Sequence, residues 1–293
     1  MSRIEVLKTY KIFIGGAFPR TESGRFYQPI HNKLPIGNMC LSSKKDIRNA
    51  VVAARKAQGA WANKSAYNRC QILYRIAEML EGRKAQFESE LQTQGSSKAN
   101  AIKEVETSID RLIYYAGWCD KYQQIFSSVN PVASSHFNFS ACEPTGVVTA
   151  LAPQKSGLLG LVSAIAPVIA GGNTVLILAS EKLPLCSISF AEVIATSDVP
   201  GGVVNIITGY KTELLSHLAT HKDVNAMLYC GEDEKDITSL QKLAVDNLKR
   251  IVIKDTSTLA TDDWENPYFI SDFQETKTTW HPIEQISGAG SGY

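Results

Sequence analysis

Cysteine is the side chain with the greatest potential for nucleophilic chemistry in this sequence, and the chain contains six of them. No two cysteines have the spacing of a zinc-ligand pair or of a Cys-x-x-Cys redox motif. We therefore interpret them as buried, reduced thiols and predict no metal site. The cysteines are Cys40, Cys70, Cys119, Cys142, Cys186 and Cys230.

The elements that would position a site are organised around residues 146–179. Residues 147–152 form a short β-branched and apolar run that ends at Pro153. A polar turn, an almost uncharged segment at 158–170 and a second apolar run at 174–179 follow. Strands that are apolar on both faces suit a parallel sheet covered by helices on each side. The sequence thus predicts a strand–turn–helix–strand unit at the heart of a doubly wound domain.

The alternation of strands and helices continues to about residue 254, and amphipathic helices precede the central unit. An alternating pattern of this kind predicts an α/β fold with a parallel five-stranded sheet. The remaining predicted strands are 203–207, 226–229 and 250–253, and the helices between them are 184–194, 213–220 and 236–247. Helical spacing of apolar residues predicts N-terminal helices at 43–61, 65–91 and 97–122.

Composition excludes several classes of partner. The chain has 293 residues, of which 44% are hydrophobic, so it can bury a large core in one or two domains. Its 30 Lys and Arg are balanced by 29 Asp and Glu, which gives no electrostatic reason to expect nucleic acid. The longest apolar run, 158–170, is shorter than the ~20 residues that cross a bilayer, and the start lacks a signal segment. We predict a cytoplasmic protein with neither a nucleic acid nor a membrane partner.

Several motifs resemble those of the aldehyde dehydrogenase superfamily, in register from about Tyr10 to Lys254. Residues 200–209, Pro-Gly-Gly-Val-Val-Asn-Ile-Ile-Thr-Gly, are the closest match. The resemblance implies a Rossmann-like cofactor domain and a β oligomerisation arm. It also implies an ancestral NAD(P)-dependent oxidation of aldehydes. The other matching segments are 12–16, 114–121, 143–148, 165–175 and 247–250.

The positions that carry the chemistry in that family are altered here. The family uses a cysteine on a separate catalytic domain, a few dozen residues beyond a general-base glutamate. That glutamate aligns with Lys254, and no cysteine lies beyond Cys230. The asparagine that stabilises the oxyanion aligns with Lys155. The resemblance therefore implies that the catalytic domain is absent and that the chain has no catalytic residues, with Lys155 and Lys254 as the degenerate positions.

Three cofactor-binding positions are retained by resemblance. Glu181 matches the glutamate that hydrogen-bonds the adenosine ribose in the family, and Gly209 and Gly231 are kept. Lys211 and Leu215 stand where the family has glycines, so approach of the backbone to the adenine is expected to be obstructed.

Two further departures concern the phosphates. Glu232 replaces the serine that meets the pyrophosphate, and a carboxylate there repels a phosphate by roughly 1 kcal/mol. A later glycine of the family has become Asp236. We expect no bound cofactor, or at most weak binding of NAD(P).

A strand of the family's oligomerisation sheet is retained near the C-terminus. Residues 269–280 resemble the strand that pairs with a hairpin, here within 132–146, of the same or a neighbouring subunit. The predicted organisation is a cofactor-binding-like domain at 1–255, an oligomerisation arm at 256–283 and a disordered tail at 284–293. The simpler interpretation is an exposed β-arm, whose unpaired edge would still invite a partner strand.

Three functions are compatible with this sequence. The first is a non-catalytic pseudoenzyme that assembles with itself or with a full-length aldehyde dehydrogenase, resembling the degenerate second module of the family's two-module members. The second is a residual NAD(P)-dependent aldehyde oxidoreductase that uses Lys155 or Lys254 as a base or imine former. The third is a nucleotide sensor at Glu181. We favour the first, with each lysine either paired with an acid such as Glu232 or solvated.

Overall fold

The fold is built on a parallel five-stranded sheet, as the sequence predicts. The computed structural model describes residues 6–283, so the tail predicted at 284–293 lies outside the described residues. All neighbouring strands of the sheet are parallel, in the order β10-β9-β8-β11-β12. The strands are β8 (Val147–Leu151), β9 (Thr174–Leu178), β10 (Val204–Ile207), β11 (Ala226–Cys230) and β12 (Arg250–Lys254).

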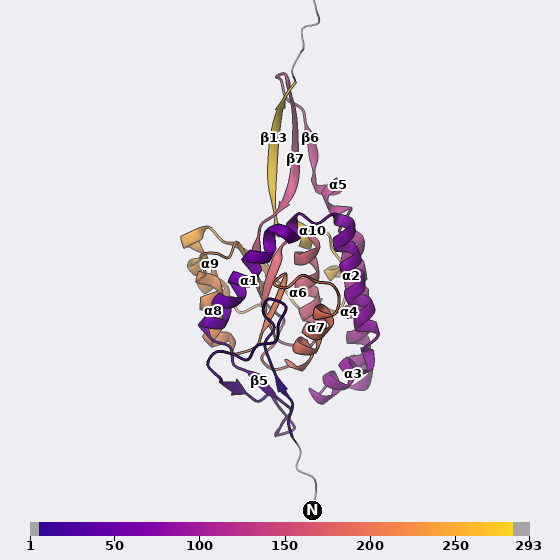
Figure 1. The fold of residues 1–293 in the computed structure, drawn as a ribbon, viewed down its shortest axis with the longest axis vertical. Coiled ribbons are helices and arrows are strands. Elements are labelled where there is room, and N and C mark those ends of the chain that lie inside the picture. The colour runs from indigo at the N-terminus through magenta and orange to yellow at the C-terminus, as the bar shows by residue number, and fades with distance from the viewer. Residues whose placement is uncertain (1–5, 284–293) are drawn as a thin grey trace, which may run out of the picture.

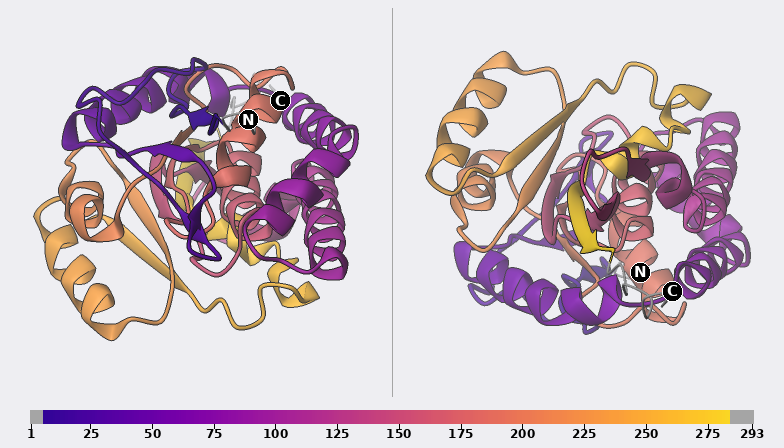
Figure 2. Two further views of the ribbon diagram at one scale, coloured as in Figure 1. Left: turned by 90° about the horizontal axis from the view of Figure 1, so that it is seen from below. Right: turned by 90° about the horizontal axis from the view of Figure 1, so that it is seen from above.

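Helices cover both faces of the sheet (Figure 2). Alternate residues of each strand point to opposite faces, so Val147 and Leu151 pack in one core and Val148 and Ala150 in the other. Both cores are apolar, which explains why the strands lack a polar face. One face carries α1 (Lys44–Ala62), α8 (Lys211–Thr220) and α9 (Glu234–Ala244), and the other carries α6 (Leu159–Ala170) and α7 (Leu185–Ala195).

An outer layer of helices packs against α6 and α7. The single helix predicted over 65–91 is wrong, because the helix ends at Gly82 and Arg83 has a non-helical φ of −113°. Glycine is a poor helix former, and the Arg83 guanidinium bonds Gln86 Oε1 at 2.8 Å. The helix predicted to end at 122 stops at 118. The helices are α2 (Ala66–Glu81), α3 (Lys84–Thr93), α4 (Lys98–Trp118) and the short α5 (Tyr122–Phe126). No helix among residues 6–283 is long and apolar enough to cross a membrane.

Two small groups of strands lie at opposite ends of the body (Figure 1). At one end an antiparallel sheet of order β13-β7-β6, which we call the arm, projects away from the domain. The arm consists of β6 (Ser128–Asn130), β7 (His136–Pro144) and β13 (Gln274–Pro282). At the other end are β1 (Thr9–Tyr10), β2 (Phe26–Tyr27), β3 (Ile30–His31), β4 (Leu34–Pro35) and β5 (Asn38–Cys40).

Residues 255–273 connect β12 to β13 and pack on the body. Leu259, Trp264, Ile270 and Phe273 are buried, and a short helix, α10 (Tyr268–Ser271), precedes β13. The segment expected as an arm at 256–283 therefore has two parts: a packed connection up to 273 and the projecting strand β13.

Candidate functional site

The candidate site lies at the carboxyl ends of β8 and β11. These strands are neighbours although β9 and β10 come between them in sequence, so the strand order reverses here. Open α/β sheets bind ligands in the crevice at such a point. The cavity in this crevice has a volume of only ≈ 210 Å³, whereas ligand pockets typically measure about 300–1,000 Å³. Its lining residues include Leu151, Gln154, Lys155, Lys211, Tyr229 and Gly231.

An ion pair lies at the border of the crevice. The Lys211 ammonium, at the first residue of α8, contacts a carboxylate oxygen of Asp236 in the first turn of α9. The Tyr229 hydroxyl donates to the same oxygen at 2.8 Å. Burial and this hydrogen bond raise the pKa of Tyr229, so the phenol stays protonated and remains a donor. The three side chains join the N-terminal ends of α8 and α9 to each other.

The retained residues Glu181, Gly209 and Gly231 each make local contacts within the chain itself. Glu181 Oε2 accepts a 3.0 Å hydrogen bond from the Lys211 backbone N–H, where it caps the first turn of α8. Gly209 has φ +154°, and a Cβ there would lie 2.8 Å from a methyl carbon of Leu214. A Cβ at Gly231 would lie 3.1 Å from the Tyr229 ring. Local packing and the positive φ are therefore sufficient reason for Gly209, whereas at Gly231 a Cβ would make a tight contact with the ring.

Lys254 lies at the end of β12 between two groups that stabilise its positive charge. Its Nζ is 2.6 Å from Asp272 Oδ2, in an ion pair without hydrogen-bond alignment, and 3.7 Å from the centroid of the Phe269 ring. Both partners belong to the connection before β13. From the sequence, Glu232 is one example of an acid that could pair with Lys254. The ion-pair partner is instead Asp272, which the connection brings close to Lys254.

Lys155 has a different environment. Its side chain is exposed and has no ion-pair partner among residues 6–283. It lines the crevice and also a second cavity of ≈ 360 Å³ that is bordered by Ser156, Thr256 and Leu259. The structure thus brings Lys155 and Gly231 to one cavity. Lys254 lies beside them in the sheet, since its carbonyl accepts from Gly231 N at 3.2 Å.

Cys230, the last cysteine of the chain, ends β11 and lines the crevice. Burial raises the pKa of its thiol to about 12, and the opposing effect of Lys254 is smaller. The thiol is therefore protonated at neutral pH and is not activated as a nucleophile. Neither Cys230 nor Tyr229 was a candidate site residue from sequence, because neither belongs to a recognisable motif.

Comparison with known proteins identifies the family. The sequence model of the aldehyde dehydrogenase family matches residues 19–254. The chain belongs to the aldehyde dehydrogenase family. An aldehyde dehydrogenase from Aspergillus niger is 32% identical over 248 residues, which are 83% of this chain and 49% of that protein. The cytosolic 10-formyltetrahydrofolate dehydrogenase of Mus musculus is 30% identical over 265 residues, 87% of this chain and 29% of that protein.

Solved structures show the same fold. The NAD⁺ complex of an aldehyde dehydrogenase from Bacillus cereus superimposes with a TM-score of 0.80 at 23% identity, over 85% of this chain and 51% of that one. PnpE from Pseudomonas sp. WBC-3 superimposes with a TM-score of 0.79 at 26% identity, over 84% and 50%. The chain thus spans about half the length of these two structures.

Two of the departures from the family pattern are coupled in space. Lys211 and Asp236 both occupy positions at which the resemblance places glycines, and their side chains contact each other. In this aldehyde dehydrogenase-like chain, a cation and an anion therefore fill space that two glycines would leave open. The described residues 6–283 contain no cluster of three or more His, Cys, Asp or Glu that could hold a metal ion.

Proposed function

We propose that this chain is a non-catalytic member of the aldehyde dehydrogenase family, which acts as a structural or regulatory subunit. It assembles with itself or with a full-length aldehyde dehydrogenase, in the cytoplasm. The observation that carries this proposal is the Lys211–Asp236 ion pair, whose lysine lines the crevice where an α/β sheet of this topology would bind its ligand. The arm supplies the second argument, because it offers open edges for association.

The residues at the crevice do not fit NAD(P). The carboxylate of Glu181, which the resemblance assigns to the ribose, already accepts from the Lys211 N–H at 3.0 Å. The crevice holds ≈ 210 Å³, below the size of typical ligand pockets. Glu232 and Asp233 add two carboxylates to its lining, which offset the two lysines there, so the lining has no excess of positive charge for a pyrophosphate. We therefore assign no step to this cofactor.

The groups needed for aldehyde oxidation are also unsuited. A general base must be free to accept a proton, but the Lys254 amino group is engaged by the Asp272 carboxylate and the Phe269 ring. The buried Cys230 has a raised pKa and cannot supply a thiolate at neutral pH. Residues 255–273 form a direct connection from β12 to β13, so no catalytic domain lies between these strands.

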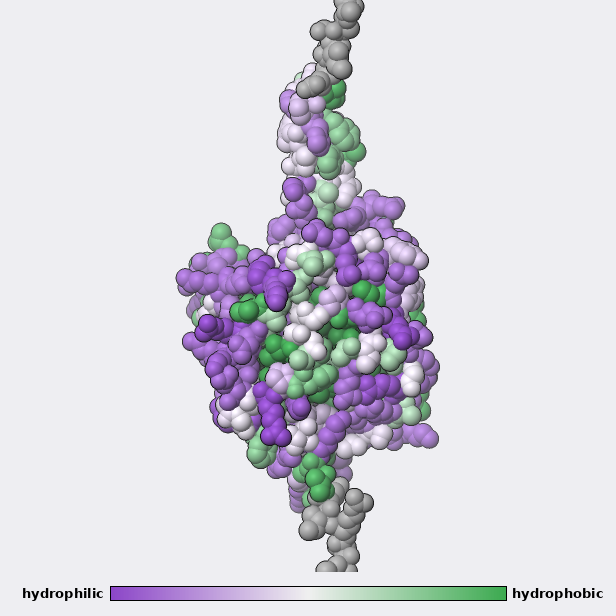
Figure 3. Space-filling model, viewed as in Figure 1, coloured by the Kyte–Doolittle hydropathy of each residue, from purple (hydrophilic) through white to green (hydrophobic). Residues whose placement is uncertain are grey.

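The arm supports the proposed assembly. Its sheet order, β13-β7-β6, leaves an edge of β13 and an edge of β6 unpaired in the described structure. Val129, Phe137 and Trp280 on the arm are 68%, 47% and 56% exposed, and Figure 3 shows hydrophobic residues among polar ones there. Open strand edges with apolar side chains tend to pair with another chain unless they are protected.

Binding and turnover measurements with the full chain test the lack of activity. We expect no saturable binding of NAD⁺ or NADP⁺ up to about 1 mM, the upper end of usual Michaelis constants, and no aldehyde-dependent reduction of either. Turnover that disappears in Lys155→Ala or Lys254→Ala would instead establish a residual oxidoreductase. Saturable binding without turnover, lost in Glu181→Ala, would establish a nucleotide sensor.

A further inference from the structure

Another cavity, of ligand size, lies between α1 and α8, outside the crevice at the switch point. Its volume is ≈ 520 Å³, within the range of small-molecule sites. We call this cavity the α1–α8 groove. None of its lining residues belongs to the crevice. The lining consists of Lys44, Lys45, Ile47, Arg48, His217, Thr220 and His221.

The lining is strongly basic although the chain as a whole carries a net charge of only +1. It contains three permanent cations and two imidazoles, and no carboxylate. Lys45 is paired with Glu22. Lys44 and Arg48 stand four residues apart on α1, so they share one side of that helix, and neither has an ion-pair partner among residues 6–283.

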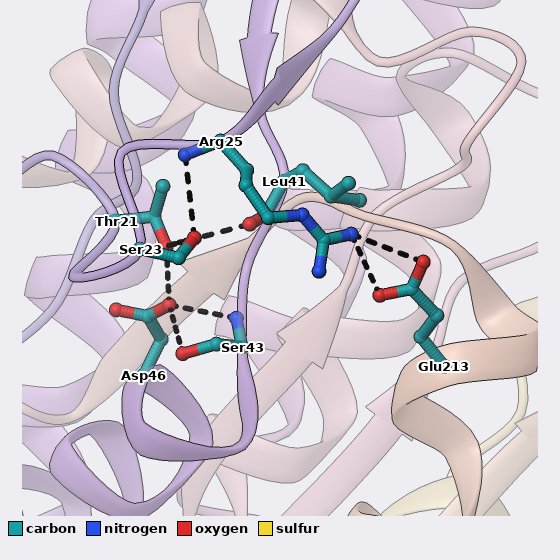
Figure 4. A network of polar contacts seen from close by, with 7 residues as sticks. All are labelled: Thr21, Ser23, Arg25, Leu41, Ser43, Asp46 and Glu213. Carbon is teal, nitrogen blue, oxygen red and sulfur yellow. Dashed lines mark hydrogen bonds and ion pairs between the residues drawn. The ribbon is translucent and has the colours of Figure 1, made fainter.

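The acidic residues of α1 and α8 are engaged elsewhere (Figure 4). Asp46 accepts from the Thr21 hydroxyl at 2.5 Å and from the Ser43 N–H at 2.7 Å, which closes the N-terminus of α1. Glu213, on the same helix as His217, accepts from Arg25 at 2.9 Å and 3.1 Å. The positive charge of the groove is therefore not neutralised by these carboxylates, and the amides at the end of α1 are not the binding element.

His221 adds a neutral donor. Burial, together with Lys249 and Arg48, lowers its pKa against the opposing effect of Asp223, so the ring is neutral at neutral pH. The backbone N–H of Asp223 donates to His221 Nδ1 at 3.3 Å, which assigns the ring proton to Nε2. Asp223 itself bonds Arg55 at 2.8 Å.

We propose that the α1–α8 groove binds the phosphate group of a small phosphorylated molecule. Lys44 and Arg48 supply charge-assisted hydrogen bonds to the phosphate oxygens, and the imidazoles supply further donors. The buried Ile47 forms an apolar part of the lining against which the organic part of the ligand packs. Nucleic acid is not the expected ligand, because the basic residues are confined to one cavity in a chain of balanced charge. This inference is independent of the proposed function.

Calorimetric titration of the full chain with phenyl phosphate, at constant ionic strength, tests the proposal. We expect saturable binding, and a loss of affinity of at least about tenfold in the double variant Lys44→Gln/Arg48→Gln. The matched control is Lys56→Gln, an exposed lysine of the same helix that lies outside the groove, and its affinity should stay within about twofold of the parent. Circular dichroism verifies that the variants are folded. If the double variant does not fold, the single variant Arg48→Gln is titrated in its place.

Inorganic phosphate, titrated in parallel, distinguishes two sources of the same chemistry. Tighter binding of phenyl phosphate supports a phosphate ester as the ligand. Equal binding of both anions, lost in the double variant, would overturn the organic part of the proposal and leave a site for free phosphate. Absence of saturation, or equal loss of affinity in the double variant and in Lys56→Gln, would overturn the site itself.

Discussion

Replacing Arg111 with alanine is expected to lower the free energy of unfolding by about 3 kcal/mol. Arg111 lies on α4 and is 1% exposed. Its guanidinium donates to Ser163 Oγ at 3.0 Å and to the Thr261 carbonyl at 3.1 Å, and its Nε lies 3.7 Å from Glu265. Removing the guanidinium leaves the buried Ser163 hydroxyl without its partner and removes the bond that holds the Thr261 carbonyl to α4. An unpaired buried hydroxyl costs more than its hydrogen bond contributes. Urea denaturation followed by circular dichroism measures the change.

Arg75→Ala is the matched control for this experiment. Arg75 lies on the exposed surface of α2, where it pairs with Glu78 at 2.7 Å. Surface pairs of this kind contribute little, so no measurable change is expected. Similar losses in the two variants would show that Arg111 does not hold residues 255–273 on the body, and the description of that connection as an integral part of the fold would then be wrong.

Asn173→Ala is expected to destabilise the chain by about 2–4 kcal/mol, the second large effect. Asn173 is fully buried, at 0% exposure. Its Oδ1 accepts from the Gly146 N–H at 2.8 Å, and its Nδ2 donates to the Phe273 carbonyl at 2.9 Å. One side chain thus ties the start of β8 to the start of β13, at the base of the arm. Thermal denaturation measures the loss of stability.

Hydrogen exchange separates this anchoring role from a general loss of stability. In Asn173→Ala the amides of β13 should exchange faster under native conditions than those of the central sheet. Asn63→Ala, at an exposed C-cap position, should change stability by less than about 0.5 kcal/mol and leave β13 protected. Uniform acceleration over the whole chain in Asn173→Ala would contradict an anchor at the base of the arm.

The central sheet could be predicted from sequence because each of its strands is apolar on both faces. Neighbouring residues such as Val147 and Val148 pack in different cores. A continuous run of apolar residues is therefore expected of a strand in a sheet that is covered on both faces. The helix break at Gly82-Arg83 was missed, because the apolar stripe runs through both helices and outweighs a single glycine. Helical periodicity is insensitive to a short interruption of this kind.

From the sequence, the candidate site could be predicted only as a set of separate substitutions relative to the family pattern. Lys211 and Asp236 each replace a glycine of the family pattern, but their contact depends on the distance between the first turns of two helices. The partner of Lys254 was likewise hidden, because Asp272 comes near only when residues 255–273 fold back on the body. Pairing across the edge of a sheet is a tertiary property that residue spacing does not encode.

The native mass of the complex formed by the tagged chain in its own source cells tests the central claim most directly. The chain alone has a mass of 32.1 kDa. The comparison variant ends at Glu275, because Gln274 and Glu275 attach β13 to the body through Gly171 and Arg250 at 2.9 Å and 2.8 Å. We predict a complex of the intact chain with itself or with a full-length aldehyde dehydrogenase, and a monomer of the variant. A monomeric intact chain, or a complex that survives the truncation, would contradict the account.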